Sequence, residues 1–231
     1  MASQAKTIEQ FIMNQPENKI LTANLLFRQI PTPLSEQAFY QTLTRLTRQG
    51  ILRHLTKGIY YRPRYSRFGE VPLCEEDILG YYTNDGKGMV IGYRLYQKYG
   101  ITTQISKKSE VLSNVVQEST KTVGNVRVSQ LKLQFTEEIC RAITVLEILQ
   151  NYRQIEEFNR QSLAAFMKKY AANYSEEAMI TVIQARKYKK STIAFLVSFL
   201  GYWKVKNMLH QYLSNMSTYS IPKMEEFYAS A

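Results

Sequence analysis

Cysteine, histidine and tryptophan are scarce in this chain of 231 residues, which has two cysteines, two histidines and one tryptophan. Cys74 and Cys140 cannot form a disulfide framework, so we expect buried free thiols of the kind that persist in a reducing cytosol. A structural zinc site would need both cysteines together with His54 and His210, at spacings unlike those of any zinc module. We therefore expect no metal and no cofactor.

Long apolar runs are also missing. The longest, residues 193–203, is interrupted by Ser198 and Gly201 and is shorter than the roughly 18 to 20 residues that span a bilayer. This run predicts a buried helix. Residues 1–15 do not contain the apolar block of a secretory signal. The sequence thus predicts a cytoplasmic protein with no membrane partner.

Acidic residues are few in the first third of the chain. The whole sequence has 30 basic and 19 acidic residues, a net charge of +11. Residues 1–67 contain ten basic and three acidic residues, a net charge of +7, whereas residues 68–134 carry +1 and residues 135–231 carry +3. Since 45% of the residues are hydrophobic, dominant disorder is excluded. A small segment with this surplus of positive charge indicates a nucleic-acid partner.

Three helices are predicted before residue 51. Apolar spacing predicts an amphipathic helix over residues 3–14, and Thr22 is placed to cap a second helix that Pro31-Thr32-Pro33 ends. The third helix has Ser35 as its N-cap and Gly50 just after its end. A hydrophobic staple between Leu34 and Phe39 is expected at its start.

The third helix has two faces. Phe39, Leu43 and Leu46 form its apolar side, and the opposite side carries amides, guanidinium groups and a hydroxyl that can contact base edges or phosphates. A solvated face on an ordinary surface helix is the alternative interpretation. The candidate major-groove residues are Gln37, Tyr40, Gln41, Thr44, Arg45 and Arg48.

Two β-prone stretches, residues 51–55 and 59–62, follow this helix. They flank Thr56-Lys57-Gly58, where Gly58 can take the positive φ of a tight hairpin. Three helices and a hairpin are the order of a winged helix-turn-helix domain, which we place at residues 1–66. A soluble linker is the alternative interpretation of the stretch from Arg62 to Tyr65. The hairpin and the residues after it supply candidate phosphate or minor-groove contacts: Arg53, Lys57, Arg62 and Arg64.

The remaining sequence predicts a small α+β unit over residues 67–134 and an all-helical region over residues 135–231 packed on it, so the predicted fold class is α+β. In the small unit, Glu75-Glu76-Asp77 opens a helix. Strands are expected at 89–91, 110–116 and 123–133, with a hairpin at Gly124-Asn125 joining the last two and a bulge or break near Ser129. Four helices are expected after Thr136, the last over residues 193–213. The basic run 186–190 is expected to be a solvated loop.

Two blocks of sequence resemble a known family. Leu43-Thr44-Arg45-Leu46, Gly50-Ile51-Leu52 and Lys57-Gly58-Ile59-Tyr60-Tyr61 resemble the winged-helix segment of AbiEi-type antitoxins of type IV toxin–antitoxin systems. Arg67-Phe68-Gly69-Glu70, Gly92-Tyr93 and Tyr99-Gly100-Ile101-Thr102-Thr103-Gln104 are similar to the region after the wing, with Ile101 in place of the commoner leucine. The resemblance covers residues 34–133.

The resemblance implies a cytosolic bacterial protein that represses its own operon by binding inverted repeats in the promoter. It also implies a functional partner, a nucleotidyltransferase-like toxin that is opposed without a stable complex. The sequence therefore predicts a non-enzymatic, sequence-specific DNA-binding autorepressor and antitoxin. Two alternatives stay open: a winged-helix protein-docking module or regulator without antitoxin activity, and a metal-dependent enzyme using Glu75, Glu76, Asp77 or Asp85.

Overall fold

The computed structural model describes residues 4–30, 35–214 and 216–228. Its fold is mixed α+β, as predicted. The chain divides into two compact units, Met1–Tyr81 with Thr122–Val126, and Tyr82–Lys121 with Arg127–Ala231. The three domains predicted from the sequence, at residues 1–66, 67–134 and 135–231, have boundaries that differ from those of these two units. The division into three domains stays a prediction.

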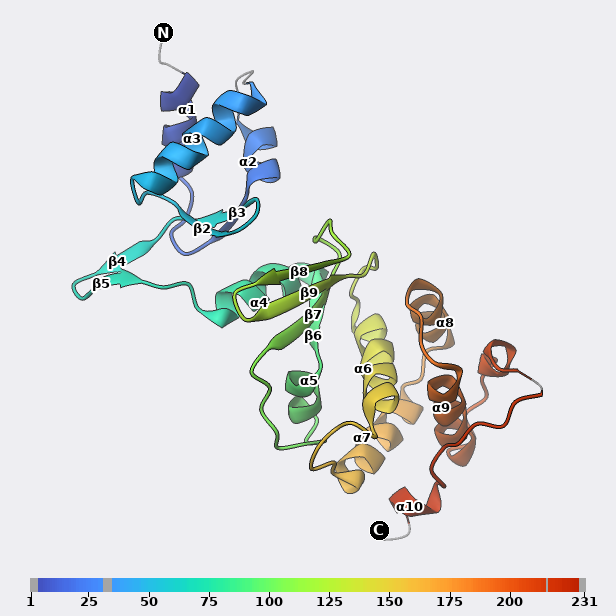
Figure 1. Ribbon diagram of the computed structural model, residues 1–231. Helices are drawn as coiled ribbons and strands as arrows, with labels where there is room; N and C mark the ends of the chain where they lie inside the picture. The colour runs from blue at the N-terminus through green and yellow to red at the C-terminus, as the bar shows by residue number, and fades with distance from the viewer. Residues whose placement is uncertain (1–3, 31–34, 215, 229–231) are drawn as a thin grey trace. The chain divides into compact units, whose positions relative to one another are not determined.

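The first unit combines three helices with a small sheet (Figure 1). The helices are α1 (Gln4–Met13), α2 (Ala23–Gln29) and α3 (Glu36–Arg48). The strands β1 (Ile20–Thr22), β2 (Arg53–Thr56) and β3 (Ile59–Tyr61) pair antiparallel in the order β1-β3-β2. The helices bury a common apolar core, whose largest members include Ile8, Ile12, Phe39, Leu43, Leu46 and Leu52.

The ends of α3 confirm two predictions. The Ser35 hydroxyl accepts a hydrogen bond of 3.2 Å from the Ala38 amide, and Gly50 takes a positive φ of 77° after the helix. Leu34, the expected staple partner of Phe39, and Pro31-Thr32-Pro33 lie outside the described residues. Thr22 is the N-cap residue of α2, as predicted, but it makes no side-chain capping bond: its buried hydroxyl has no hydrogen-bond partner among the described residues.

A second hairpin, which the sequence reading missed, follows the first sheet directly. Strands β4 (Arg64–Ser66) and β5 (Gly69–Val71) pair antiparallel and form a separate two-stranded sheet. The linker considered for Arg62 to Tyr65 is thus partly a strand. Helix α4 (Glu75–Thr83) comes next, and its first-turn Asp77 accepts a 3.0 Å hydrogen bond from the Cys74 amide, as the acidic residue of a capping box does.

The second unit contains most of a four-stranded sheet in the order β6-β7-β9-β8. Its elements are η1 (Asn84–Gly86), β6 (Gly88–Ile91), α5 (Tyr93–Lys98), β7 (Ser109–Ser113), β8 (Thr120–Val123) and β9 (Val126–Gln130). The hairpin at Gly124-Asn125 joins β8 to β9, so its predicted place between 110–116 and 123–133 is wrong. The mostly polar stretch Thr120–Val123 has too little apolar alternation to be recognised as a strand. Strand β9 also runs through Ser129 without a break.

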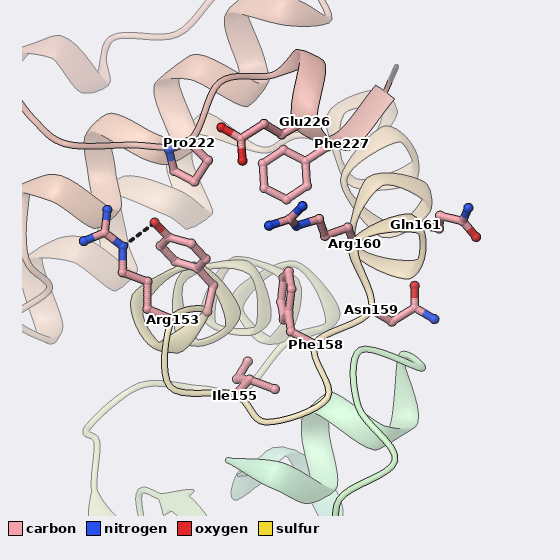
Figure 2. A pocket seen from close by; sticks show the side chains of 10 residues that line it. Arg153, Ile155, Phe158, Asn159, Arg160, Gln161, Pro222, Glu226 and Phe227 are labelled. Carbon is pink, nitrogen blue, oxygen red and sulfur yellow. Dashed lines mark hydrogen bonds between the residues drawn. The ribbon is translucent and has the colours of Figure 1, made fainter. Parts of the chain in front are cut away.

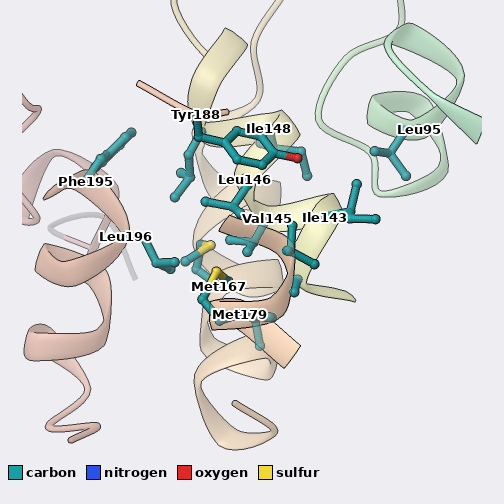
Figure 3. Packing of buried hydrophobic residues seen from close by; sticks show 14 of the residues in the cluster. Leu95, Ile143, Val145, Leu146, Ile148, Met167, Met179, Tyr188, Phe195 and Leu196 are labelled. Carbon is teal, nitrogen blue, oxygen red and sulfur yellow. The ribbon is translucent and has the colours of Figure 1, made fainter. Parts of the chain in front are cut away.

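Helices dominate the rest of this unit. They are α6 (Glu137–Asn151), α7 (Arg160–Ala172), α8 (Glu176–Ala185) and α9 (Lys190–Tyr202), followed by η2 (Leu209–Tyr212) and α10 (Glu225–Tyr228). Helix α6 is central, because α7, α8 and α9 all contact it. Figure 3 shows Val145, Leu146 and Ile148 of α6 among the side chains of this core.

Three further expectations concern the helix predicted over residues 193–213, the two cysteines and membrane-spanning helices. Residues 193–200 are largely buried in α9, as predicted, but the helix ends at Tyr202 and does not continue to Leu213, since Lys204 takes a positive φ of 56°. The expectation of buried thiols is wrong for Cys74, which is exposed, whereas Cys140 is half-buried. Within the described ranges, no helix combines the length and the apolar character needed to cross a bilayer.

Candidate nucleic-acid interface

Helix α3 presents one polar face to solvent. Its apolar residues Phe39, Leu43 and Leu46 are fully buried. The opposite face is open, and its exposed residues are Gln37, Tyr40, Gln41, Thr44 and Arg48. The Thr44 hydroxyl donates to the Tyr40 carbonyl at 2.9 Å, and among the described residues Arg48 has no carboxylate partner. The face therefore has amides and a guanidinium group available for an external partner.

Arg45 differs from the other members of this face. Its Nη2 lies 2.8 Å from Oε2 of Glu9 in α1, and its Nη1 donates to Oε1 of Gln49 at 3.2 Å. The side chain still keeps 42% of its surface exposed. Arg45 therefore holds α1 against α3, and a contact with DNA would have to compete with Glu9.

The β2–β3 hairpin places one cation at its turn. Gly58 takes a φ of 70°, and Lys57 beside it is exposed. His54 and Tyr60, which are paired across the two strands, lie with their ring centroids 5.1 Å apart. A lysine at the tip of such a hairpin can approach a phosphate group without disturbing the sheet.

Two of the predicted phosphate contacts are used inside the molecule. Arg53 forms a two-pronged ion pair with Glu70 of β5, in which Nε lies 2.9 Å and 3.1 Å from the two carboxylate oxygens. Arg62 donates to the Gln15 carbonyl and lies 3.9 Å from Oε1 of Glu17, with only 17% of its side chain exposed. These two arginines thus tie neighbouring segments together.

The pairing of Arg53 with Glu70 changes the acid–base properties of both groups. The hydrogen bonds from Arg53 lower the pKa of the Glu70 carboxyl below its ordinary value and raise the pKa of the guanidinium group. Both charges are therefore present at neutral pH, and they neutralise each other.

The second hairpin exposes Arg64, one of the predicted phosphate or minor-groove contacts, together with aromatic side chains that the predicted site does not include. Arg64 is exposed, as are Tyr65, Arg67 and Phe68. The Arg67 guanidinium lies 4.6 Å from the centre of the Phe68 ring. Ser66 and Gly69 flank a two-residue turn, and Gly69 takes a positive φ of 111°. Serine and glycine are typical turn residues, so their spacing is the sequence feature that could have indicated this hairpin.

The basic run of residues 186–190 is solvated only in part, which corrects the prediction for it. Arg186 Nη2 lies 3.0 Å from Oε1 of Glu147, and the Tyr188 hydroxyl donates to the same oxygen at 3.1 Å. Glu147 is 3% exposed, and burial raises the pKa of its carboxyl although Arg186 and Tyr188 oppose the shift. Lys187, Lys189 and Lys190 are exposed.

A pocket of about 670 Å³ opens in the second unit. Figure 2 shows the Arg160 side chain between Phe158 and Phe227, with Glu226 beside Phe227. Arg153 is held by the Tyr152 hydroxyl, 2.6 Å from its Nε, and by Ser220. The charged groups that line this pocket are one carboxylate and two guanidinium groups, set among aromatic rings. This set lacks a nucleophile next to a general base, so the pocket does not indicate catalysis.

Within the described residues, no three histidine, cysteine, aspartate or glutamate side chains gather as a metal site. The candidate interface consists of the open face of α3, the Lys57 turn and the Arg64 hairpin.

Comparison of the chain with models of known protein families and with curated proteins found no match.

Proposed function

We propose that the first unit is a winged helix-turn-helix that binds double-stranded DNA, with α3 in the major groove and the β2–β3 hairpin as the wing. The element order α1-β1-α2-α3-β2-β3 with a β1-β3-β2 sheet supports this proposal. The observation that carries it is the open polar face of α3, backed by fully buried apolar residues; Lys57 is exposed at the turn of the β2–β3 hairpin.

Within this proposal the base-reading candidates are the exposed residues of α3, with Arg48 in place of Arg45 as the principal guanidinium group. Lys57 and Arg64 contact phosphates. Arg53 and Arg62 do not contact DNA in this proposal. They hold neighbouring segments of the first unit together, since their guanidinium groups are paired with oxygen atoms of the chain itself. The chain acts without catalysis, as a repressor of its own operon in a bacterial cytoplasm.

The antitoxin activity rests on the resemblance to AbiEi-type antitoxins. In this proposal the chain opposes a nucleotidyltransferase-like toxin without forming a stable complex with it. Co-expression with the neighbouring reading frame tests this part: growth should be restored by the chain and also by its Arg48→Ala variant, in which only DNA binding is expected to be weakened. Failure of both proteins to restore growth would leave a regulator without antitoxin activity.

Binding of the purified chain to a duplex from upstream of its own reading frame tests the DNA-binding part. Fluorescence anisotropy across a salt series should show affinity that falls steeply as salt rises, because phosphate contacts release counterions. A scrambled duplex of equal length is the control for sequence preference. No binding at low salt would favour the protein-docking alternative.

The enzyme alternative needs its own experiment. The chain is incubated with labelled DNA and RNA in the presence of Mg²⁺ or Mn²⁺, and cleavage is followed on a gel. We expect no cleavage. Cleavage that the Glu76→Ala variant abolishes would contradict the proposal and assign chemistry to the acids at the start of α4.

A further inference from the structure

The β4–β5 hairpin has few contacts to explain its position. Among the described residues its two strands pair only with each other, and five of the six strand residues are exposed. None of its side chains belongs to the apolar core of the first unit. An isolated two-stranded hairpin is marginally stable in water, so this one depends on its attachment.

The attachment is polar and lies at the base of the hairpin. Asn18 accepts a hydrogen bond of 3.1 Å from the Arg64 amide and donates one of 3.4 Å to the Val71 carbonyl. Arg53 of β2 holds Glu70 through its two-pronged ion pair. The Arg53 side chain also lies close to Gly50, the residue just after α3. A Cβ added to Gly50 would be 3.3 Å from Arg53 Nη1. The base is thus fixed beside the end of α3 and the first hairpin.

The free end of the hairpin is aromatic and basic. Phe68 at the turn is 85% exposed, with the Arg67 guanidinium over its ring, and Tyr65 is 59% exposed. The only acid of the hairpin, Glu70, is neutralised by Arg53. An exposed aromatic ring beside guanidinium groups suits a partner that offers both stacking surfaces and negative charge. The arginines indicate that this partner is polyanionic.

We propose that the β4–β5 hairpin is a second DNA-binding element, in which Arg64 and Arg67 contact phosphates and Phe68 inserts between base pairs from the minor groove. The inference rests on the proposed binding of duplex DNA by the first unit. Proteins that enter the minor groove commonly place an apolar wedge between base steps and bend the duplex. The base of the hairpin is held by Arg53, whose guanidinium group lies beside Gly50 at the end of α3, so in this proposal the hairpin lies against the same duplex as α3.

The test uses the full chain and the upstream duplex, labelled at both ends for energy transfer. The wild-type chain should bend the duplex, and Phe68→Ala should remove the bend and weaken binding by about tenfold. Phe68→Leu should keep most of both effects, because leucine is also an effective wedge. Ile105→Ala is the matched control, since Ile105 is 83% exposed and lies in the second unit.

The outcomes separate this inference from the proposed function. If the wild-type chain binds the duplex and Phe68→Ala behaves like Ile105→Ala, the wedge is wrong and DNA binding by α3 stands. If the wild-type chain does not bind duplex DNA at low salt, both are wrong. Tighter, Phe68-dependent binding to a single-stranded oligonucleotide would overturn the wedge in favour of base stacking. Equal melting temperatures of the variants show that folding is unchanged.

Discussion

At the residue scale, internal pairing divides the basic side chains of the first unit into two groups. Arg45, Arg53 and Arg62 lie against Glu9, Glu70 and Glu17, while Arg48 has no carboxylate partner among the described residues. An exposed ion pair contributes little to stability, but it does hold a guanidinium group in place. Availability for DNA is therefore decided by the partner of each arginine.

Substitutions at Arg48 and Glu9 should have opposite effects on DNA binding. Arg48→Ala should weaken binding to the upstream duplex by about 1–3 kcal/mol, which is typical of a lost base contact. Glu9→Gln should strengthen it, because the change removes a negative charge and releases Arg45. Anisotropy titrations at one salt concentration measure both. Weaker binding by Glu9→Gln would mean that Arg45 contributes by holding α1.

The buried carboxyl of Glu147 should make stability depend on pH. Its pKa is raised by burial above the ordinary 4.5 of the unfolded chain, so the folded state holds the proton more tightly. The free energy of unfolding should therefore fall as the pH rises from 4.5 through the raised pKa. Urea unfolding at several pH values should show that Glu147→Gln removes this fall. Exposed Glu177→Gln serves as the control and should retain it.

At the scale of elements, local patterns located most helices but missed short polar strands. The Ser35 cap and the positive φ of Gly50 set the ends of α3 as its sequence predicts. Strand β8 and the β4–β5 hairpin escaped because they are three to four residues long and mostly polar. Their pairing with neighbouring strands, which single-segment patterns do not contain, defines them.

Two glycines should respond in opposite ways to alanine. A Cβ at Gly88 in β6 would collide with the carbonyl oxygens of Leu112 and Tyr82, whereas a Cβ at Gly201 in α9 meets nothing within 4 Å. Gly88→Ala should lower the free energy of unfolding by about 2 kcal/mol or more, and Gly201→Ala should raise it by about 0.5–1 kcal/mol. Urea unfolding measures both. A neutral Gly88→Ala would show that the sheet shifts at low cost.

At the scale of the whole molecule, charge is distributed unevenly. Residues 1–67 hold +7 of the net charge of +11. The exposed cations of the first unit should therefore govern the salt dependence of DNA binding.

Lysine substitutions in the two units test this expectation. Lys57→Ala should reduce the slope of log affinity against log salt by about one, because one phosphate contact is lost. Lys107→Ala removes the same charge from the second unit, where Lys107 is also exposed, and should leave the slope unchanged. Equal slopes for both variants would place the DNA elsewhere on the chain.

Much of the first unit follows from sequence alone. Apolar spacing and caps predict its three helices, Gly58 predicts the first hairpin, and the charge surplus singles out residues 1–67. These features depend on neighbours within a few residues, which is the range over which helical periodicity and turn chemistry act. The open face of α3 follows from the same periodicity.

Only the tertiary structure decided which predicted arginines are available. Arg45 and Glu9 are 36 residues apart in the chain, and Arg53 and Glu70 are 17 apart. Ion pairs between such positions form when folding brings two elements together, so no local pattern contains them. The sequence determined the kinds of side chain on the candidate interface, and the packing of α1 and β5 determined which of them can reach a partner.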